Sequence, residues 1–158
     1  MTLRAILFFL LLVSGPLLAQ SDSSFEAKVI AVKDGDTIEI IYDSFTTRVR
    51  LSHIDCPEKG QPFGKAAKTY TSDLCFGRIV RVQAQAKPDR YGRLLAEVFV
   101  GDSCINKALV RAGMAWHYLQ YSKDTSYSSL ETKAHQQQAG LWTESDPIAP
   151  WLWRKGIR

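Results

Sequence analysis

Apolar and polar residues alternate along the first half of the chain in a pattern that predicts β-strands. Every second residue is apolar from Phe25 to Ala31 and again from Ile38 to Tyr42, and the turn 33–36 separates these two runs. A polar break at Asp43-Ser44 precedes a third run, which ends at Leu51. Strands joined by such short turns pair with their neighbours, so we expect a three-stranded meander.

The second half of the chain predicts helices and two further strands. Apolar residues recur at helical spacing in three segments, 63–75, 103–113 and 126–139. Ser103 is expected to cap the second helix, and Gly113 to end it. The predicted strands are residues 80–84 and 94–100. Short strands with three helices indicate one small α+β domain, and a closed five-stranded barrel is the favoured form of its sheet.

The first residues differ in composition from the rest of the chain. Arg4 precedes the apolar run 5–13 and a Gly15-Pro16 break, and a short apolar stretch then ends at Ala19. This is the layout of a secretory signal peptide over residues 1–19. We therefore expect cleavage after Ala19 and a secreted or periplasmic mature domain, residues 20–158, with no stable membrane association. An uncleaved membrane anchor is the alternative, although the run is short for a membrane span.

Charge and cysteine content narrow the picture further. The chain carries 20 Lys and Arg against 16 Asp and Glu, a formal net charge of +4 that is compatible with a polyanionic partner. Its three cysteines, Cys56, Cys75 and Cys104, match no zinc-binding spacing. Because an exported protein meets an oxidising compartment, we expect a disulfide between Cys75 and Cys104, with two buried thiols as the alternative.

The stretch Arg48–Glu58 carries the strongest candidate chemistry. In an extended strand, Arg50 points away from the face that its apolar neighbours present to a core. Strand structure should fade by Pro57, so that Asp55 and Glu58 flank a rigid turn. Two carboxylates and a guanidinium this close can hold a cation and an anion together. A solvated turn with a surface ion pair is the alternative.

Two other polar segments and the C-terminal tail complete the candidates. Asp36 opens a strand directly after a glycine turn, where turn chemistry alone could account for it. The segment Lys87–Arg93 places three cations, an aromatic residue and a glycine between two strands, which would suit phosphate binding, or would form a solvated hairpin tip. The tail Trp151–Arg158 is aromatic and basic, and we expect its tryptophans to pack onto the barrel.

Taken together in their order, these segments carry a family resemblance. The motifs are Asp34-Gly35-Asp36-Thr37, Arg50-Leu51 with Ile54–Glu58, and Asp89–Arg93, followed by Asn106–Arg111, Gly113-Met114-Ala115 and Gly140-Leu141-Trp142. The chain resembles the staphylococcal nuclease family, or thermonucleases, over nearly all of its mature length. The resemblance implies an OB-fold barrel with three helices. It also implies a calcium-dependent endonuclease that hydrolyses DNA and RNA and leaves 3′-phosphates.

The resemblance also implies roles for single residues. By position, the Ca²⁺ ligands would be Asp36, Asp55 and the backbone carbonyl of Cys56, where the family often has Thr. Hard oxygen ligands suit Ca²⁺, whereas a soft thiolate would not. The remaining matches are Glu58 as general base, Arg50 and Arg93 as phosphate-binding arginines, and Tyr91 and Tyr121 as residues that line the nucleotide pocket.

Two other functions compete with the enzyme. One is an inactive OB-fold module that only binds nucleic acid, and the other is an exported structural or adhesion domain whose basic tail meets anionic surfaces. Inactive modules typically lose acids or arginines from the site. The five residues Asp36, Arg50, Asp55, Glu58 and Arg93 are all present, which favours an enzyme. We expect this enzyme to be a monomer.

Overall fold

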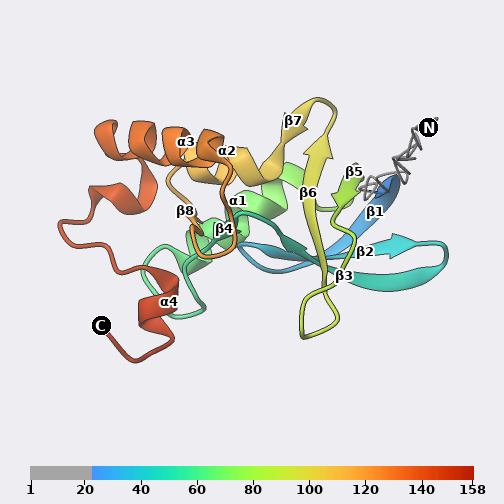
Figure 1. Cartoon of the computed structure of the whole chain (residues 1–158), viewed down its shortest axis with the longest axis horizontal. Coiled ribbons are helices and arrows are strands. Elements are labelled where there is room, and N and C mark those ends of the chain that lie inside the picture. Colours follow the sequence, from blue (N-terminus) through green and yellow to red (C-terminus); the bar gives the residue numbers. More distant parts are fainter. Residues whose placement is uncertain (1–22) are drawn as a thin grey trace, which may run out of the picture.

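The computed structural model describes residues 23–158, and the predicted signal peptide lies outside the described residues. A six-stranded sheet in the order β3-β2-β1-β5-β6-β7 is closed by parallel pairing of β3 with β6. Its strands are β1 (Ser23–Asp34), β2 (Thr37–Tyr42), β3 (Phe45–Leu51), β5 (Ile79–Ala84), β6 (Leu94–Val100) and β7 (Ser103–Cys104). The pairing of β3 with β6 closes β1, β2, β3, β5 and β6 into a barrel, and β7 extends the sheet beyond it. This closure confirms the predicted α+β fold with a five-stranded barrel (Figure 1).

Three helices cover the barrel as predicted: α1 (Gly64–Cys75), α2 (Ile105–Arg111) and α3 (Thr125–Gln136). Two short helices, η1 (Gly140–Thr143) and α4 (Pro150–Trp153), and a small sheet of β4 (Ile54–Asp55) with β8 (Trp116–His117) were not predicted. Figure 1 shows α4 and the C-terminus on the opposite side of the molecule from the β2–β3 hairpin. Within residues 23–158, no helix has the length and apolar character of a membrane span.

The helix boundaries differ from the prediction at two caps. Ser103 lies in β7, so the N-cap of α2 is Cys104, which makes no side-chain cap hydrogen bond. The α3 helix begins one residue earlier than expected, because the Asp124 carboxylate accepts a hydrogen bond from the Ser126 amide at 2.8 Å. These differences arise because neighbouring strands and local acceptors compete for the same backbone groups.

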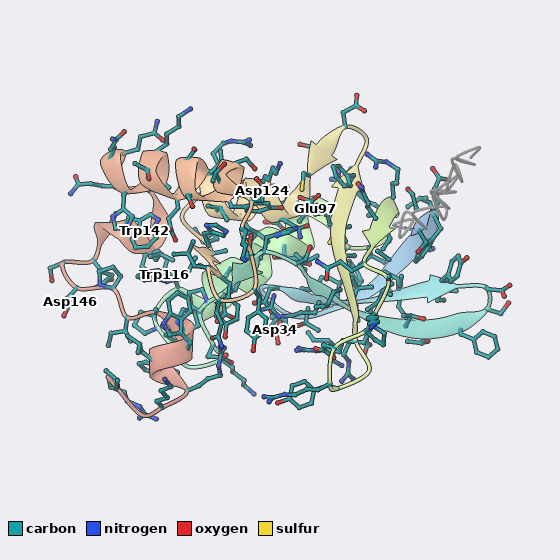
Figure 2. All side chains as sticks on the ribbon, viewed as in Figure 1. Asp34, Glu97, Trp116, Asp124, Trp142 and Asp146 are labelled. Carbon is teal, nitrogen blue, oxygen red and sulfur yellow. The ribbon has the colours of Figure 1, made fainter. Side chains whose placement is uncertain are left out.

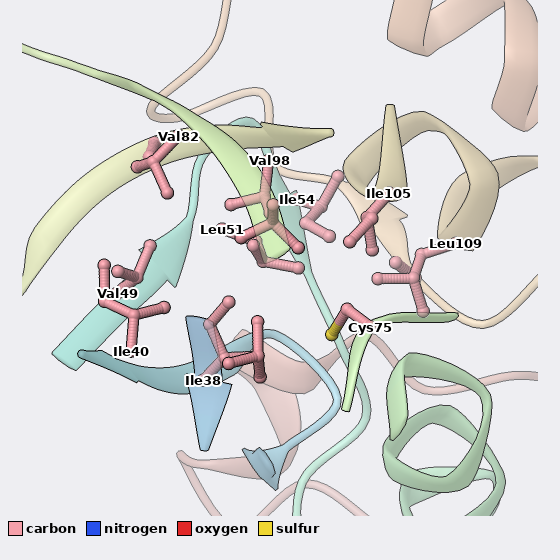
Figure 3. Packing of buried hydrophobic residues seen from close by; sticks show 14 of the residues in the cluster. Ile38, Ile40, Val49, Leu51, Ile54, Cys75, Val82, Val98, Ile105 and Leu109 are labelled. Carbon is pink, nitrogen blue, oxygen red and sulfur yellow. The ribbon is translucent and has the colours of Figure 1, made fainter. Parts of the chain in front are cut away.

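The core lies inside the barrel and continues beneath α2. Strand residues that alternate inward are fully buried, and Ile105 and Leu109 of α2 pack against them (Figure 3). In β1 the pairing register shifts between Val29 and Ala31, and beyond this irregularity Val32 packs against the core. The predicted alternation therefore holds up to Val29 and is interrupted after it.

The predicted disulfide between Cys75 and Cys104 is wrong, since all three cysteines are free. The Cys75 thiol donates to the carbonyl of Thr71 in its own helix at 3.1 Å, and the Cys104 thiol faces Glu97 and Tyr127. Burial raises the pKa of Cys75 to about 11 and also raises the pKa of Cys104. The two thiols thus have separate partners and stay protonated.

Asn106 fastens α2 to the place where the barrel closes. Its side chain is fully buried. The side-chain oxygen accepts from the Val98 amide at 3.0 Å, and the side-chain nitrogen donates to the carbonyls of Ser52 and Ala96, both at 3.0 Å. One amide therefore satisfies three backbone groups on both sides of the β3–β6 seam.

Replacing Asn106 with Leu should destabilise the protein strongly, because the Val98 amide and the Ser52 carbonyl lose this partner, whereas the Ala96 carbonyl still accepts from the Ser52 amide. At about 1 to 3 kcal/mol for an unsatisfied buried group, we expect the free energy of unfolding to fall by about 3 to 5 kcal/mol. Urea denaturation measures this loss. Arg111→Ala, an exposed change on the same helix, is the control and should cost under about 0.5 kcal/mol. Equal stability of the two variants would contradict the assigned role.

Candidate active site

Arg50 lies at the centre of the site, at the end of β3. Its side chain is only 12% exposed. The nitrogen Nη2 contacts Asp55 Oδ1 at 2.8 Å and Asp36 Oδ2 at 3.1 Å. The pairing of Thr37 with Arg50 between β2 and β3 brings Asp36 to this position, and the pairing of β4 with β8 fixes Asp55. A carboxylate from the turn before β2 and one from β4 therefore meet at one guanidinium nitrogen.

The other terminal nitrogen of Arg50 holds the turn that carries Asp55. Nη1 donates to the carbonyls of Leu51 at 2.6 Å and Ile54 at 2.8 Å. Burial alone would lower the pKa of Arg50, but the charges of Asp36 and Asp55 raise it above its ordinary value. Arg50 therefore remains a cation, and its position depends on the two carboxylates.

The side chain of Asp36 binds the backbone of Cys56. Asp36 Oδ2 accepts from the Cys56 amide at 2.8 Å. Gly35 permits this approach, because a Cβ atom there would lie 2.7 Å from Cβ of Cys56. Burial raises the pKa of the Cys56 thiol well above its usual range. The thiol therefore stays neutral, which agrees with leaving its sulfur out of the predicted ligand set. Figure 2 marks Asp34, two residues before Asp36, near the middle of the molecule.

Glu58 lies in the loop between β4 and α1, and Gln61 shapes this loop. The Glu58 amide donates to Gln61 Oε1 at 2.9 Å, and the Gln61 amide donates to the Glu58 carbonyl at 2.9 Å. Gly64 begins α1 so close to the loop that a Cβ atom there would lie 2.1 Å from the Glu58 carbonyl oxygen. The Glu58 side chain is 37% exposed, so its carboxylate is accessible to water.

Arg154, which follows α4, is the site residue that the sequence analysis missed. Its Nη2 contacts Asp55 Oδ2 at 2.8 Å and its Nη1 contacts Asp55 Oδ1 at 3.3 Å. Nη1 also donates to Glu58 Oε1. The tail was expected to pack through its tryptophans, and a basic residue directly after them was the only signal of this contact. The tail thus contributes a second arginine to the carboxylates.

The structure does not bring Arg93 into this cluster. The pairing of Val49 with Leu94 places Arg93 beside the strand that carries Arg50. Its guanidinium, however, pairs at 2.7 Å with Asp89 of its own loop. Among the described residues, no hydrogen bond or ion pair joins Arg93 to the three site carboxylates. Arg93 is therefore a neighbour of the site, held in place by Asp89.

The two predicted nucleotide-pocket tyrosines are exposed. Tyr91 lies on the loop of Arg93, with the Arg93 Cζ atom 5.3 Å from the centre of its ring. Tyr121 packs edge-on against Tyr118, with ring centres 4.9 Å apart. Both tyrosines are about two-thirds exposed, at 67% and 69%. They thus leave aromatic surface accessible.

The carboxylates of Asp36 and Asp55 are the side-chain donors that could hold a divalent cation. Across residues 23–158, no group of three or more His, Cys, Asp and Glu side chains is arranged to hold a metal ion. Asp36 and Asp55 nevertheless converge, because both contact the same nitrogen of Arg50. Burial raises the pKa of Asp55, and the hydrogen bond from Arg154 opposes this shift. Two converging carboxylates with a main-chain carbonyl and water as further donors fit Ca²⁺, which takes oxygen ligands in irregular geometry.

Fold and site together define a small barrel protein that gathers three carboxylates and two arginines beside the β3–β4 turn. The family described as "Staphylococcal nuclease homologue" matches residues 48–144. The chain belongs to this staphylococcal nuclease family, which confirms the resemblance inferred from its motifs.

Relatives from three bacteria support this assignment. An "Uncharacterized endonuclease" of Escherichia coli O157:H7 is 41% identical over 133 residues, which cover 84% of this chain and 86% of the relative. An "Uncharacterized endonuclease" of Haemophilus influenzae is 39% identical over 96% of this chain and 85% of its own length. The "Micrococcal nuclease" of Shigella flexneri is 38% identical over 86% of this chain and 84% of its own length.

Arg50→Met should destabilise the fold because it leaves two buried carboxylates without their shared cation. Removing one partner of a buried ion pair costs about 3 to 5 kcal/mol, and we expect a loss of that size in the free energy of unfolding at pH 7. Urea denaturation of Arg48→Met serves as the control, since Arg48 pairs with Glu39 at the surface, where a pair contributes about 0 to 1 kcal/mol. A loss no larger than that of the control would show that Arg50 does not hold the site together.

Proposed function

We propose that this protein is an exported, Ca²⁺-dependent endonuclease that hydrolyses phosphodiester bonds of DNA and RNA and leaves 3′-phosphates. The observation that carries the proposal is the convergence of Asp36 and Asp55 on Arg50, next to the exposed carboxylate of Glu58. Family membership and the nuclease names of the relatives support it. The apolar segment before Ala19 supports export, and an N-terminus at Gln20 in the mature protein would test that part.

Glu58 is proposed as the general base. Within the described residues, its hydrogen bond to Arg154 uses Oε1, which leaves Oε2 to orient a water molecule and accept its proton. The loop around Gln61 and Gly64 fixes the backbone of Glu58, so the carboxylate is presented from a defined position. Such fixed geometry is what proton transfer requires.

Asp36, Asp55 and the carbonyl of Cys56 would hold the cation. When bound, Ca²⁺ would supply positive charge next to the phosphoryl oxygen and the attacking water. Asp36 and Asp55 each keep a fixed orientation, since Asp36 accepts from the Cys56 amide and Asp55 from Arg50. The carboxylates are thus oriented by the protein in advance.

Arg50 and Arg93 are proposed to bind the phosphate as negative charge builds on its oxygens. A guanidinium suits this role because its planar fork binds two oxygens and remains charged. The same persistent charge makes either arginine a poor proton donor. Both are paired with carboxylates here, so phosphate binding exchanges at least one of these contacts. Tyr91 and Tyr121 are proposed to stack with bases near the site.

Glu58→Gln should fold normally and lose hydrolysis, because the amide cannot accept the proton of the attacking water. We expect turnover of DNA to fall by about 10²- to 10⁴-fold, the usual contribution of general base catalysis. Glu144→Gln, which makes the same change at an exposed position, should retain full turnover. Steady-state hydrolysis of both variants makes the comparison, and near-normal turnover of Glu58→Gln would contradict the assigned base.

Ca²⁺ should support hydrolysis better than Mg²⁺. Oxygen ligation by two carboxylates and a carbonyl tolerates the irregular shell of Ca²⁺, whereas Mg²⁺ demands a small octahedral one. Hydrolysis of naked DNA and of RNA should appear with Ca²⁺ and disappear with a chelator. Binding of nucleic acid without any hydrolysis would instead identify an inactive binding module, and equal or faster hydrolysis with Mg²⁺ would contradict the proposed ligand set.

A further inference from the structure

Arg154 contacts the same carboxylates that the proposed function assigns to the cation and to the base. It donates to both oxygens of Asp55, at 2.8 Å and 3.3 Å, and to Oε1 of Glu58. It lies outside the segment 48–144 that matches the family. The match to the family therefore does not account for this contact.

The backbone that carries Arg154 is anchored beside the site. Trp151 of α4 stacks on Tyr118, with ring centres 5.3 Å apart and an angle of 2° between the planes, and it forms a T-shaped pair with Trp116, with ring centres 5.7 Å apart. Trp116 in turn packs on Trp142, and Figure 2 shows these two rings next to each other. These aromatic contacts fix the start of the tail, so Arg154 reaches the carboxylates from a defined position.

The loop of the proposed base is joined to the same tail. The side chain of Gln61 is buried, and its nitrogen donates to the Ile148 carbonyl at 2.6 Å while its oxygen accepts from the Glu58 amide at 2.9 Å. One side chain thus sets the distance between the Glu58 loop and the segment that precedes α4. Arg154 and Glu58 therefore each lie on a segment whose backbone is held in place, and their side chains meet between these segments.

The two arginines on Asp55 differ in their freedom to leave. The Arg50 side chain is 12% exposed and also donates to two backbone carbonyls. The Arg154 side chain is 42% exposed, and within residues 23–158 the hydrogen bonds of its guanidinium go to carboxylates alone. A cation bound to Asp55 would lie within a few ångströms of the Arg154 guanidinium, and like charges at such distances repel. Arg154 is thus the group that a cation would displace.

We propose that Arg154 is an internal counter-cation of the active site. Without bound Ca²⁺ it neutralises Asp55 and Glu58 and holds them in place, and it releases Asp55 when Ca²⁺ binds. The tail thereby sets the cation concentration at which the site is filled. This proposal rests on the proposed Ca²⁺ site at Asp36 and Asp55.

The test is a calorimetric titration of the folded protein with Ca²⁺, in low salt and without nucleic acid. Arg154→Met removes the counter-cation, and we expect Ca²⁺ to bind about 10-fold more tightly or better, the usual scale of coupling between two ligands of one site. Lys155→Met removes the same charge one residue further along, where the structure shows no ion pair to the site carboxylates, and should change the affinity by less than about 2-fold. Arg154→Lys, which keeps the charge but loses the bidentate fork, should give an intermediate affinity.

The outcomes separate the two hypotheses. Equal affinities of Arg154→Met and Lys155→Met, or weaker binding by Arg154→Met with a melting temperature like that of the control, would overturn the counter-cation. Absence of Ca²⁺ binding in all of these proteins, including the unmodified one, would overturn the proposed cation site and the counter-cation with it.

Discussion

The ion pairs of Arg50 with Asp36 and Asp55 are the constraint on which the rest of the site depends. Two carboxylates that are almost fully buried would repel each other and lose hydration, and a shared guanidinium offsets both effects. The same guanidinium binds the carbonyls of Leu51 and Ile54, so charge neutralisation and the shape of the β3–β4 turn are one interaction. The pair can form only because the β2–β3 register sets Thr37 opposite Arg50.

Closure of the barrel also determines the position of Arg93, the second arginine proposed to bind phosphate. Parallel pairing of β3 with β6 brings Arg93 next to the strand of Arg50, although more than 40 residues separate them in the chain. Asn106 fixes the same seam from α2 through three hydrogen bonds. Stability of the seam and placement of the arginines therefore have a common structural cause.

The C-terminal tail supplies the remaining support. Gln61 couples the Glu58 loop to Ile148, and the stacked rings of Tyr118 and Trp151 hold α4 against the body of the protein. Arg154 then adds positive charge beside Asp55 and Glu58. The position of the proposed base thus depends on residues about 90 positions further along the chain.

The sequence by itself determined the five barrel strands, the three main helices, the family, and which residue types meet at the β3–β4 turn. These features follow from alternation, helical spacing and short motifs, which are properties of neighbouring residues. Only the tertiary structure decided that Arg50 is buried between Asp36 and Asp55, that Arg93 pairs with Asp89, and that Arg154 reaches Glu58. It also decided that Cys75 and Cys104 remain free, because each thiol finds its own partner. Such contacts depend on how distant elements pack and on which charges compete within the packed site, and no local pattern in the chain encodes that competition.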